Sequence, residues 1–173
     1  SKPNKRALEH EADRILAAGE RTRISESLAE LVKCGTAFHH AGLGGGHRRI
    51  IEDSFRQGKI KVLTATPTLA FGVNLPARIV VIQDYRRYEP GYGYYPISVL
   101  EYKQMAGRAG RPKYDKVGEA ILTAKTADEA DYLMESYILA RPERIWSRLA
   151  VERILRSHVL ATIAADFAHT ERG

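Results

Sequence analysis

The sequence predicts an α/β fold in which a parallel sheet is flanked by helices and followed by a short all-α segment. Two apolar runs, 60–64 and 79–82, are rich in β-branched residues and lack polar alternation, which is typical of strands buried on both faces. Helical stripes alternate with these runs at short spacing, a pattern that favours a parallel sheet. From Glu143 onward no strand signal remains.

The first half of the chain is expected to hold three helices and two strands. Apolar residues at helical spacing predict a helix over 7–16 that stops at Gly19, and a second helix that stops near Gly35. The second helix is expected to carry Leu28, Leu31 and Val32. A short strand at 36–38, a flexible glycine turn at 44–46, a helix ended by Gly58 and the strand at 60–64 are expected to follow.

The second half shows two helix-start signatures and then a change of pattern. Ser98 with Glu101 precedes a helix at 102–106, and Thr126 with Glu129 opens a helix through about 138. Between them, 120–123 is expected to be a strand. A domain boundary is expected near 138–142. Beyond it, helices reach about Ala168, with a stripe of Trp146, Leu149, Ala150 and Ile154.

Composition excludes several classes of protein. The 173 residues are 44% hydrophobic and 28% charged, which is ordinary for a globular protein. No apolar run approaches the roughly 20 residues that cross a bilayer. Cys34 is the only cysteine, so no internal disulfide is possible and a reducing cytoplasm fits best. The net charge of +6 suits a nucleic acid, although many enzymes are equally basic.

The strongest candidate site is the segment 104–112, Gln-Met-Ala-Gly-Arg-Ala-Gly-Arg-Pro. Arg108 and Arg111 each follow a glycine at a helix end, and glycine lets the backbone approach a partner closely. Guanidinium groups carry fixed charge and suit the growing charge of a phosphoryl group in transfer. The alternative is a basic loop paired with surface carboxylates.

Two further segments directly follow predicted strands. Thr66 and Thr68 lie in the loop after 60–64, at the carboxyl edge of a parallel sheet where ligands bind. Their hydroxyls and the following helix start suit phosphate oxygens, although threonine is also a common helix cap. His39 and His40 follow the strand at 36–38. Adjacent histidines diverge, so no metal site is expected, and one of the two is expected to be structural.

Together, these three segments resemble motifs IVa, V and VI of superfamily 2 helicases. The phrases "AFHHAGL", "ATPTLAFGVNLPAR" and "EYKQMAGRAGRP" are most similar to the Ski-two-like branch, within it to archaeal DNA repair helicases related to the helicase domain of DNA polymerase theta. The resemblance implies a RecA-like fold. It makes 1–139 the second motor domain and 140–173 the truncated start of a winged-helix domain.

The resemblance also implies roles by position. Gln104, Arg108 and Arg111 would face ATP, with Arg108 and Arg111 as the γ-phosphate contacts. Gly72 and Asn74 would sit near the nucleotide. The DNA backbone would be held by His39, His40, Gly42, Thr66 and Thr68. The position after Gln104, often arginine in the wider superfamily, is Met105, to which no phosphate role is assigned.

A tyrosine-rich segment at 84–96 lies between motifs V and VI and is punctuated by Pro90-Gly91, which predicts a hairpin. Exposed aromatic side chains at a hairpin tip can stack on unpaired bases. In the family this position holds a wedge that separates the strands of the duplex. The wedge would be formed by Arg86, Arg87, Tyr88, Tyr92, Tyr94 and Tyr95. The alternative is a loop packed against the next domain.

No phosphate loop and no Asp-Glu-x-His motif occur in the 173 residues. The family places both in a first motor domain, so ATP and Mg²⁺ are expected to be held mainly there, and this chain alone is not expected to hydrolyse ATP. The resemblance implies 3′-to-5′ unwinding of forked DNA in repair or replication restart. The expected partners are single-stranded and forked DNA, the first motor domain and replication or repair proteins. Alternatives are an RNA helicase of the same branch and a non-catalytic nucleic-acid-binding module.

Overall fold

A computed structural model describes residues 4–67, 69, 73, 75–111, 114–143 and 152–165. The chain divides into two compact units, Ser1–Ala140 and Arg141–Gly173. In the second unit the described residues include helix α7 (Glu152–Ala164). Trp146, Leu149 and Ala150 of the predicted stripe lie outside the described residues. No helix of the described part is long and apolar enough to span a membrane.

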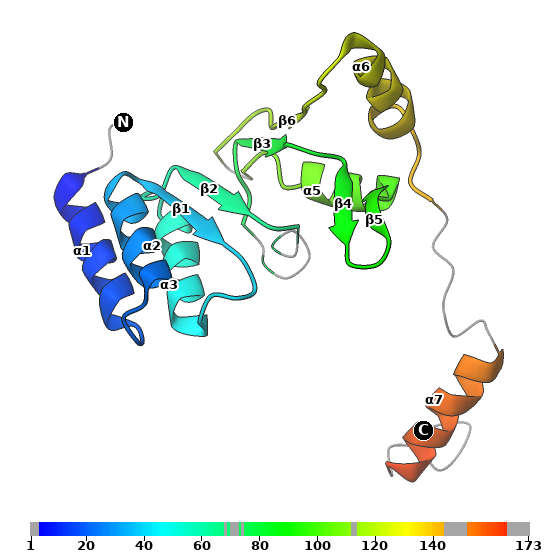
Figure 1. Cartoon of the computed structure of the whole chain (residues 1–173), viewed down its shortest axis with the longest axis horizontal. Helices are drawn as coiled ribbons and strands as arrows, with labels where there is room; N and C mark the ends of the chain where they lie inside the picture. The colour runs from blue at the N-terminus through cyan, green and yellow to red at the C-terminus, as the bar shows by residue number, and fades with distance from the viewer. Residues whose placement is uncertain are drawn as a thin grey trace. The chain divides into compact units, whose positions relative to one another are not determined.

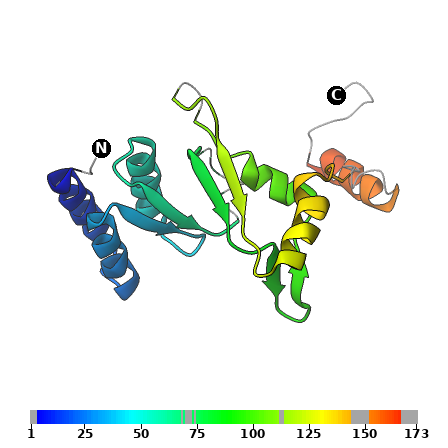
Figure 2. The same ribbon diagram turned by 90° about the horizontal axis from the view of Figure 1, so that it is seen from above.

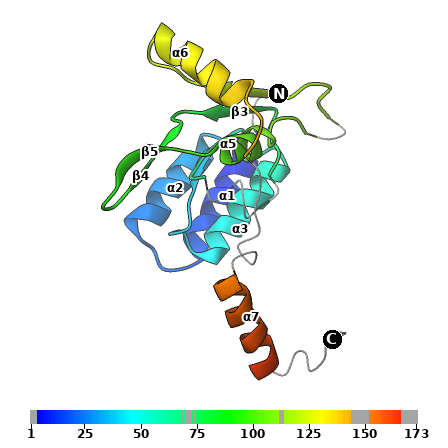
Figure 3. The same cartoon turned by 90° about the vertical axis from the view of Figure 1, so that its right-hand side faces the viewer.

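The N-terminal part of the first unit contains two parallel strands packed against helices (Figure 1). In chain order the elements are α1 (Lys5–Ala17), α2 (Arg23–Lys33), β1 (Thr36–His39), α3 (Gly45–Arg56) and β2 (Val62–Ala65). β1 pairs with β2 in parallel, with Thr36 opposite Val62 and His39 opposite Ala65. Helix α1 packs against α2 and α3, which both contact β1 (Figure 3).

The core of this part is built from one side of each helix. Its most enclosed side chains, all at most 1% exposed, are Ile15, Leu28, Val32, Ile51 and Ile60. Helix α2 begins with a reciprocal cap, because the Thr22 hydroxyl accepts from the Ser25 N–H and the Ser25 hydroxyl accepts from the Thr22 N–H. The predicted helix carries Leu28, Leu31 and Val32 as expected; Leu31 lies outside its buried face and is 40% exposed.

A second set of elements completes the first unit. It comprises β3 (Ile79–Ile82), β4 (Arg86–Glu89), β5 (Gly93–Pro96), α5 (Val99–Ala106), β6 (Glu119–Leu122), α6 (Ala127–Leu133) and the π-helix η1 (Met134–Ile138). β3 and β6 are parallel neighbours, with Ile79 opposite Glu119 (Figure 2). β4 and β5 form an antiparallel hairpin.

An aromatic cluster holds this second set together. Tyr102 of α5 and Tyr137 of η1 meet edge to face, with ring centroids 5.6 Å apart. Both side chains are buried, together with Ile82, Ile97 and Leu133. The Tyr137 hydroxyl donates to the Ile97 carbonyl at 2.7 Å, which satisfies its one polar group. This bond ties η1 to the segment between the hairpin and α5.

The α/β fold class is confirmed, and one predicted local structure is wrong. Gly45 and Gly46 form the first turn of α3 rather than a flexible loop. A Cβ on Gly46 would lie 3.2 Å from the Ala18 carbonyl, so the close approach of this turn to α1 favours glycine. The helix predicted from Thr126 through about 138 is confirmed, and its last part, after Leu133, is a π-helix in which the Leu139 N–H donates to the Met134 carbonyl.

The β3–β6 pair is covered on one face. Val80, Ile82 and Leu122 pack into the aromatic cluster, whereas Ile79 and Val81 on the alternate positions are 45% and 59% exposed. The expectation that helices cover both faces is therefore wrong for this strand pair among the described residues. The β-branched composition indicated the strands correctly and did not distinguish one covered face from two.

One carboxylate is buried in the first core. Glu11 is 1% exposed and accepts from Lys59 Nζ at 2.5 Å and from Arg14 Nη1 at 2.7 Å. Burial raises the pKa of Glu11, but the hydrogen bond from Lys59 and the two positive charges outweigh it, so the pKa is lower than its usual value. The carboxylate therefore links α1 to the end of the turn that follows α3.

Candidate functional site

The loop that carries both arginines leaves α5 and is anchored by its backbone. Gly107 ends the helix, and its N–H donates to the Lys103 carbonyl at 2.8 Å. The Ala77 N–H donates to the Arg108 carbonyl at 2.9 Å, and the Gly110 N–H donates to the Ala77 carbonyl at 2.7 Å. This two-way bridge fixes the loop to the end of motif V, directly before β3.

Glycines allow a second close approach at the same loop. Gly110 adopts a φ of 92°, which glycine tolerates best. A Cβ on Gly118 would overlap the backbone of Ala109 and Gly110. Gly118 therefore presses directly on the turn that precedes Arg111. No local pattern in the sequence indicates this role, because nothing in the spacing of Gly118 distinguishes it from a loop glycine.

The two arginines have different surroundings. Arg108 is partly buried, whereas the Arg111 side chain is 46% exposed. Arg111 Nε and Nη2 each donate to a different oxygen of Asp115, both at 2.8 Å. The alternative of a basic loop paired with a carboxylate thus describes Arg111 in this structure. The pairing leaves the guanidinium at the surface. Gln104, in the last turn of α5, is also exposed.

The ends of β1 and β2 bring motif IVa against the start of motif V. The Thr66 N–H donates to the His39 carbonyl at 3.2 Å, and Thr66 is exposed. His39 itself is only 5% exposed. Its Nε2 lies 3.0 Å from Glu52 Oε1 on α3, and because a carboxylate only accepts, Nε2 donates. His39 is therefore the structural histidine of the pair.

His40 faces a different environment. Its ring stacks on Phe38, with centroids 5.7 Å apart, and its Nδ1 accepts from the Gly42 N–H at 3.1 Å. A neutral imidazole that accepts at Nδ1 carries its proton at Nε2, so His40 offers a donor there. A Cβ on Gly42 would lie 3.0 Å from Nδ1, which explains the glycine. Thr68, Gly72 and Asn74 lie outside the described residues.

The hairpin exposes an aromatic face. Tyr88 and Tyr94 are opposite each other, with centroids 5.3 Å apart, and are 60% and 73% exposed. Tyr92 at the tip is 83% exposed, and Tyr95 is half-buried. Arg87 on the other face donates to Glu101 of α5. The predicted cap at Ser98 forms through the Glu101 N–H, while the Glu101 carboxylate turns to Arg87 instead.

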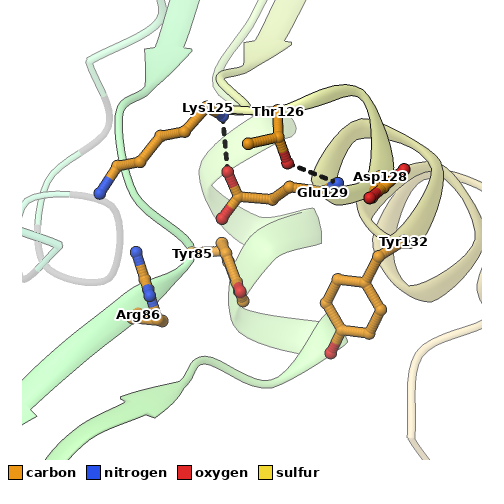
Figure 4. A pocket seen from close by; sticks show the side chains of 7 residues that line it. All are labelled: Tyr85, Arg86, Lys125, Thr126, Asp128, Glu129 and Tyr132. Carbon is orange, nitrogen blue, oxygen red and sulfur yellow. Dashed lines mark hydrogen bonds between the residues drawn. The ribbon is translucent and has the colours of Figure 1, made fainter.

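A pocket of about 440 Å³ lies at the base of the hairpin (Figure 4). It is lined by Tyr85, Arg86, Lys125, Thr126, Asp128, Glu129 and Tyr132. Arg86 Nε donates to Asp84 at 3.2 Å, and Glu129 caps the N–H of Lys125 at 2.5 Å. The lining has two cations, Arg86 and Lys125, and two carboxylates, Asp128 and Glu129, so it has no net charge to select an anion.

Among the residues that the structure describes, no group of three or more His, Cys, Asp or Glu side chains could hold a metal ion.

Two pairs of parallel strands, with a glycine–arginine loop anchored by backbone hydrogen bonds beside one of them, are the α/β arrangement of a RecA-like helicase domain. The chain belongs to the helicase conserved C-terminal domain family, which matches residues 4–113. This membership confirms the motif-based identification as a superfamily 2 helicase.

Similar proteins named ATP-dependent DNA helicase Hel308 occur in archaea. They are 58% identical over 151 residues in Methanocella arvoryzae, 52% over 147 in Caldivirga maquilingensis and 50% over 157 in Pyrobaculum calidifontis. The alignments cover 87%, 85% and 91% of this chain, but only 20%, 19% and 22% of the relatives. The chain thus spans about a fifth of the length of the curated relatives that it matches.

Proposed function

We propose that this chain is the second motor domain of an ATP-dependent DNA helicase, with residues 1–139 forming the RecA-like domain and 140–173 beginning a winged-helix domain. The relatives named as DNA helicases support DNA over RNA as the substrate. In this proposal the helicase moves 3′ to 5′ and opens forked DNA during repair or replication restart.

The observation that carries the proposal is the anchored arginine loop. Backbone hydrogen bonds on both sides of Ala77 tie motif VI to the end of motif V. A movement of the arginine loop on ATP binding or hydrolysis would therefore be transmitted through these backbone bonds to Ala77, at the end of the motif that begins with the DNA-contacting Thr66. Contiguous contacts of this kind carry energetic coupling between distant sites, here between ATP hydrolysis and strand movement.

The exposed guanidinium of Arg111 suits a triphosphate bound by a neighbouring domain. Of its five N–H donors, Asp115 engages one on Nε and one on Nη2, which leaves others for γ-phosphate oxygens. Gln104, Arg108, Gly72 and Asn74 would complete this face. ATP and Mg²⁺ would be held mainly by the first motor domain, because the 173 residues contain no phosphate loop.

Contacts to the DNA backbone would come from the loops after β1 and β2. The Nε2–H of His40 and the hydroxyl of exposed Thr66 are donors suited to phosphate oxygens, and phosphate contacts carry no sequence preference. Gly42 would admit the strand closely, and Thr68 would add a hydroxyl. His39 would act by holding this loop through its pairing with Glu52.

The test is made in the full-length protein. Arg111→Ala should lower DNA-stimulated ATP hydrolysis by about 10³- to 10⁵-fold and leave DNA binding near wild type. Arg21→Ala is the matched control, because Arg21 is 69% exposed and pairs with Glu26, much as Arg111 pairs with Asp115. Near-normal turnover of Arg111→Ala would remove the assignment of Arg111 as a γ-phosphate contact and with it the motor function proposed here.

A further inference from the structure

Asp115 makes more contacts to Arg111 than an incidental surface pair would. Its carboxylate accepts from the Arg111 backbone N–H at 3.0 Å as well as from Nε and Nη2 of the side chain. In return, the Asp115 N–H donates to the Arg111 carbonyl at 3.0 Å. Arg111 and Asp115 are therefore joined through both their backbones and their side chains.

Arg111 and Asp115 differ in how far their side chains are buried. The Asp115 side chain is 10% exposed, whereas that of Arg111 is 46% exposed. A neighbouring ring supports the guanidinium from one side, since the Arg111 Cζ lies 5.8 Å from the centre of Tyr114. The carboxylate is thus the fixed partner, and the arginine projects from it toward solvent.

The side-on geometry decides what the pair can do. Asp115 occupies the Nε–Nη2 edge of the guanidinium, so the edge that contains Nη1 points away from the carboxylate. Contact with a phosphate does not require the ion pair to break. An inhibitory carboxylate that competed with phosphate would have to bind the edge that contains Nη1, which we call the outer edge. Asp115 does not bind that edge.

We infer that Asp115 is a positioning residue that holds Arg111 with its outer edge ready for the γ-phosphate of ATP on the neighbouring motor domain. This inference rests on the proposed function. A long, freely rotating arginine must lose its rotamer freedom when it reaches a transition state, and a bidentate partner removes that freedom beforehand. The hydrogen bonds from Arg111 lower the pKa of Asp115 to about 2, so the carboxylate is ionised at neutral pH.

The experiment compares variants of the full-length helicase. Asp115→Asn keeps the shape of the side chain and removes its charge. It should lower the kcat of DNA-stimulated ATP hydrolysis about 10- to 100-fold, the scale of a group misplaced by about 1 Å. KM for ATP and the unfolding temperature should change little. Asp53→Asn is the matched control, because it removes the carboxylate of the exposed Arg56–Asp53 pair.

A double variant separates positioning from an independent role. In the Arg111→Ala background, Asp115→Asn should cause no further loss of kcat, because Asp115 acts through the missing side chain. Multiplicative losses would overturn the inference, as would an unchanged kcat for Asp115→Asn alone. A rise in ATP hydrolysis without DNA would identify an inhibitory carboxylate instead and also overturn it.

Two further readouts complete the design. If Asp115→Asn lowers the unfolding temperature, Asp115→Glu retains the charge and should give a kcat between those of wild type and Arg111→Ala. A kcat for Asp115→Glu below that of Arg111→Ala would contradict the inference. An inactive Arg111→Ala beside a fully active Asp115→Asn would remove the positioning role alone, whereas an active Arg111→Ala would remove the proposed function as well.

Discussion

Arg87 on β4 donates a hydrogen bond to the Glu101 carboxylate on α5, and this ion pair joins the tyrosine hairpin to the helix that leads into the arginine loop. Glu101 is partly buried, at 14% exposure of its side chain, while Arg87 is 41% exposed. From Glu101, α5 runs past Gln104 to its end at Ala106, and Arg108 lies in the loop that follows. The hairpin and the candidate ATP-facing residues are therefore connected through one short helix.

Breaking this connection should uncouple unwinding from ATP hydrolysis. In the full-length protein, Glu101→Gln should reduce the rate of duplex unwinding by about 2- to 30-fold, corresponding to a coupling change of ~0.5–2 kcal/mol, and leave ATP hydrolysis much less affected. Glu30→Gln, which removes the partner of Lys33 in an exposed pair on α2, is the control. Equal losses of unwinding and hydrolysis for Glu101→Gln would show that the pair only supports α5.

The exposed tyrosines of the hairpin lead to a second prediction. Replacing Tyr88 and Tyr94 together by alanine, or shortening 88–95, should impair unwinding more than ATP hydrolysis. Each base stacked on an aromatic ring contributes roughly 1–3 kcal/mol, so binding to a fork should also weaken. Ile24→Ala removes a 52% exposed apolar side chain on α2 and should change neither activity. Parallel losses of both activities would favour the packing alternative for the hairpin.

The contact at Gly118 gives a third prediction. Gly118→Ala should force the Ala109–Gly110 backbone to move, because a Cβ cannot fit there. The expected cost is about 1–3 kcal/mol of stability, with ATP hydrolysis falling as Arg111 shifts. Gly45→Ala adds the same atom in the first turn of α3, where a Cβ meets nothing within 4 Å. That control should be neutral or stabilising by about 0.4–1 kcal/mol. Thermal unfolding and steady-state ATP hydrolysis measure both.

The sequence predicted the elements well because their signals are local. The Ser98 and Thr126 caps and the strand at Ile79–Ile82 each follow from side chains within a few positions. Contacts between distant segments left no such signal. The bridge from Ala77 to Ala109 and the pairing of Arg87 with Glu101 depend on how the elements pack. Motif spacing indicated Arg108 and Arg111 as site residues, but not that Arg111 would be paired with Asp115.

The pair of histidines shows the same limit at the level of one site. The sequence indicated that one of His39 and His40 would be structural, but their adjacency could not decide which. The structure assigns His39, because alternation along β1 turns its ring toward Glu52 on α3 while His40 follows the strand end. That distinction depends on how β1 packs against α3, which no local sequence pattern indicates.

The buried carboxylate of Glu11 gives a prediction about folding stability and pH. Glu11→Gln keeps the shape of the side chain but weakens its bonds to Lys59 and Arg14, at an expected cost of about 1–3 kcal/mol at neutral pH. The measurement is urea unfolding of the 173-residue chain. Glu26→Gln, which affects the exposed pair with Arg21, should cost less than about 1 kcal/mol.

The direction of the pH effect follows from the pKa of Glu11, which is lower in the folded chain than usual. As pH falls, the unfolded chain binds this proton first, so the stability contributed by Glu11 is fully present above the unfolded pKa of about 4.3. It is lost as pH drops through the folded pKa below that value. The difference in unfolding free energy between wild type and Glu11→Gln should therefore be largest near neutral pH and shrink in acid. A difference that stays constant from pH 7 down to about pH 3, a range that crosses the unfolded pKa, would mean that packing rather than the ion pairs makes Glu11 stabilising.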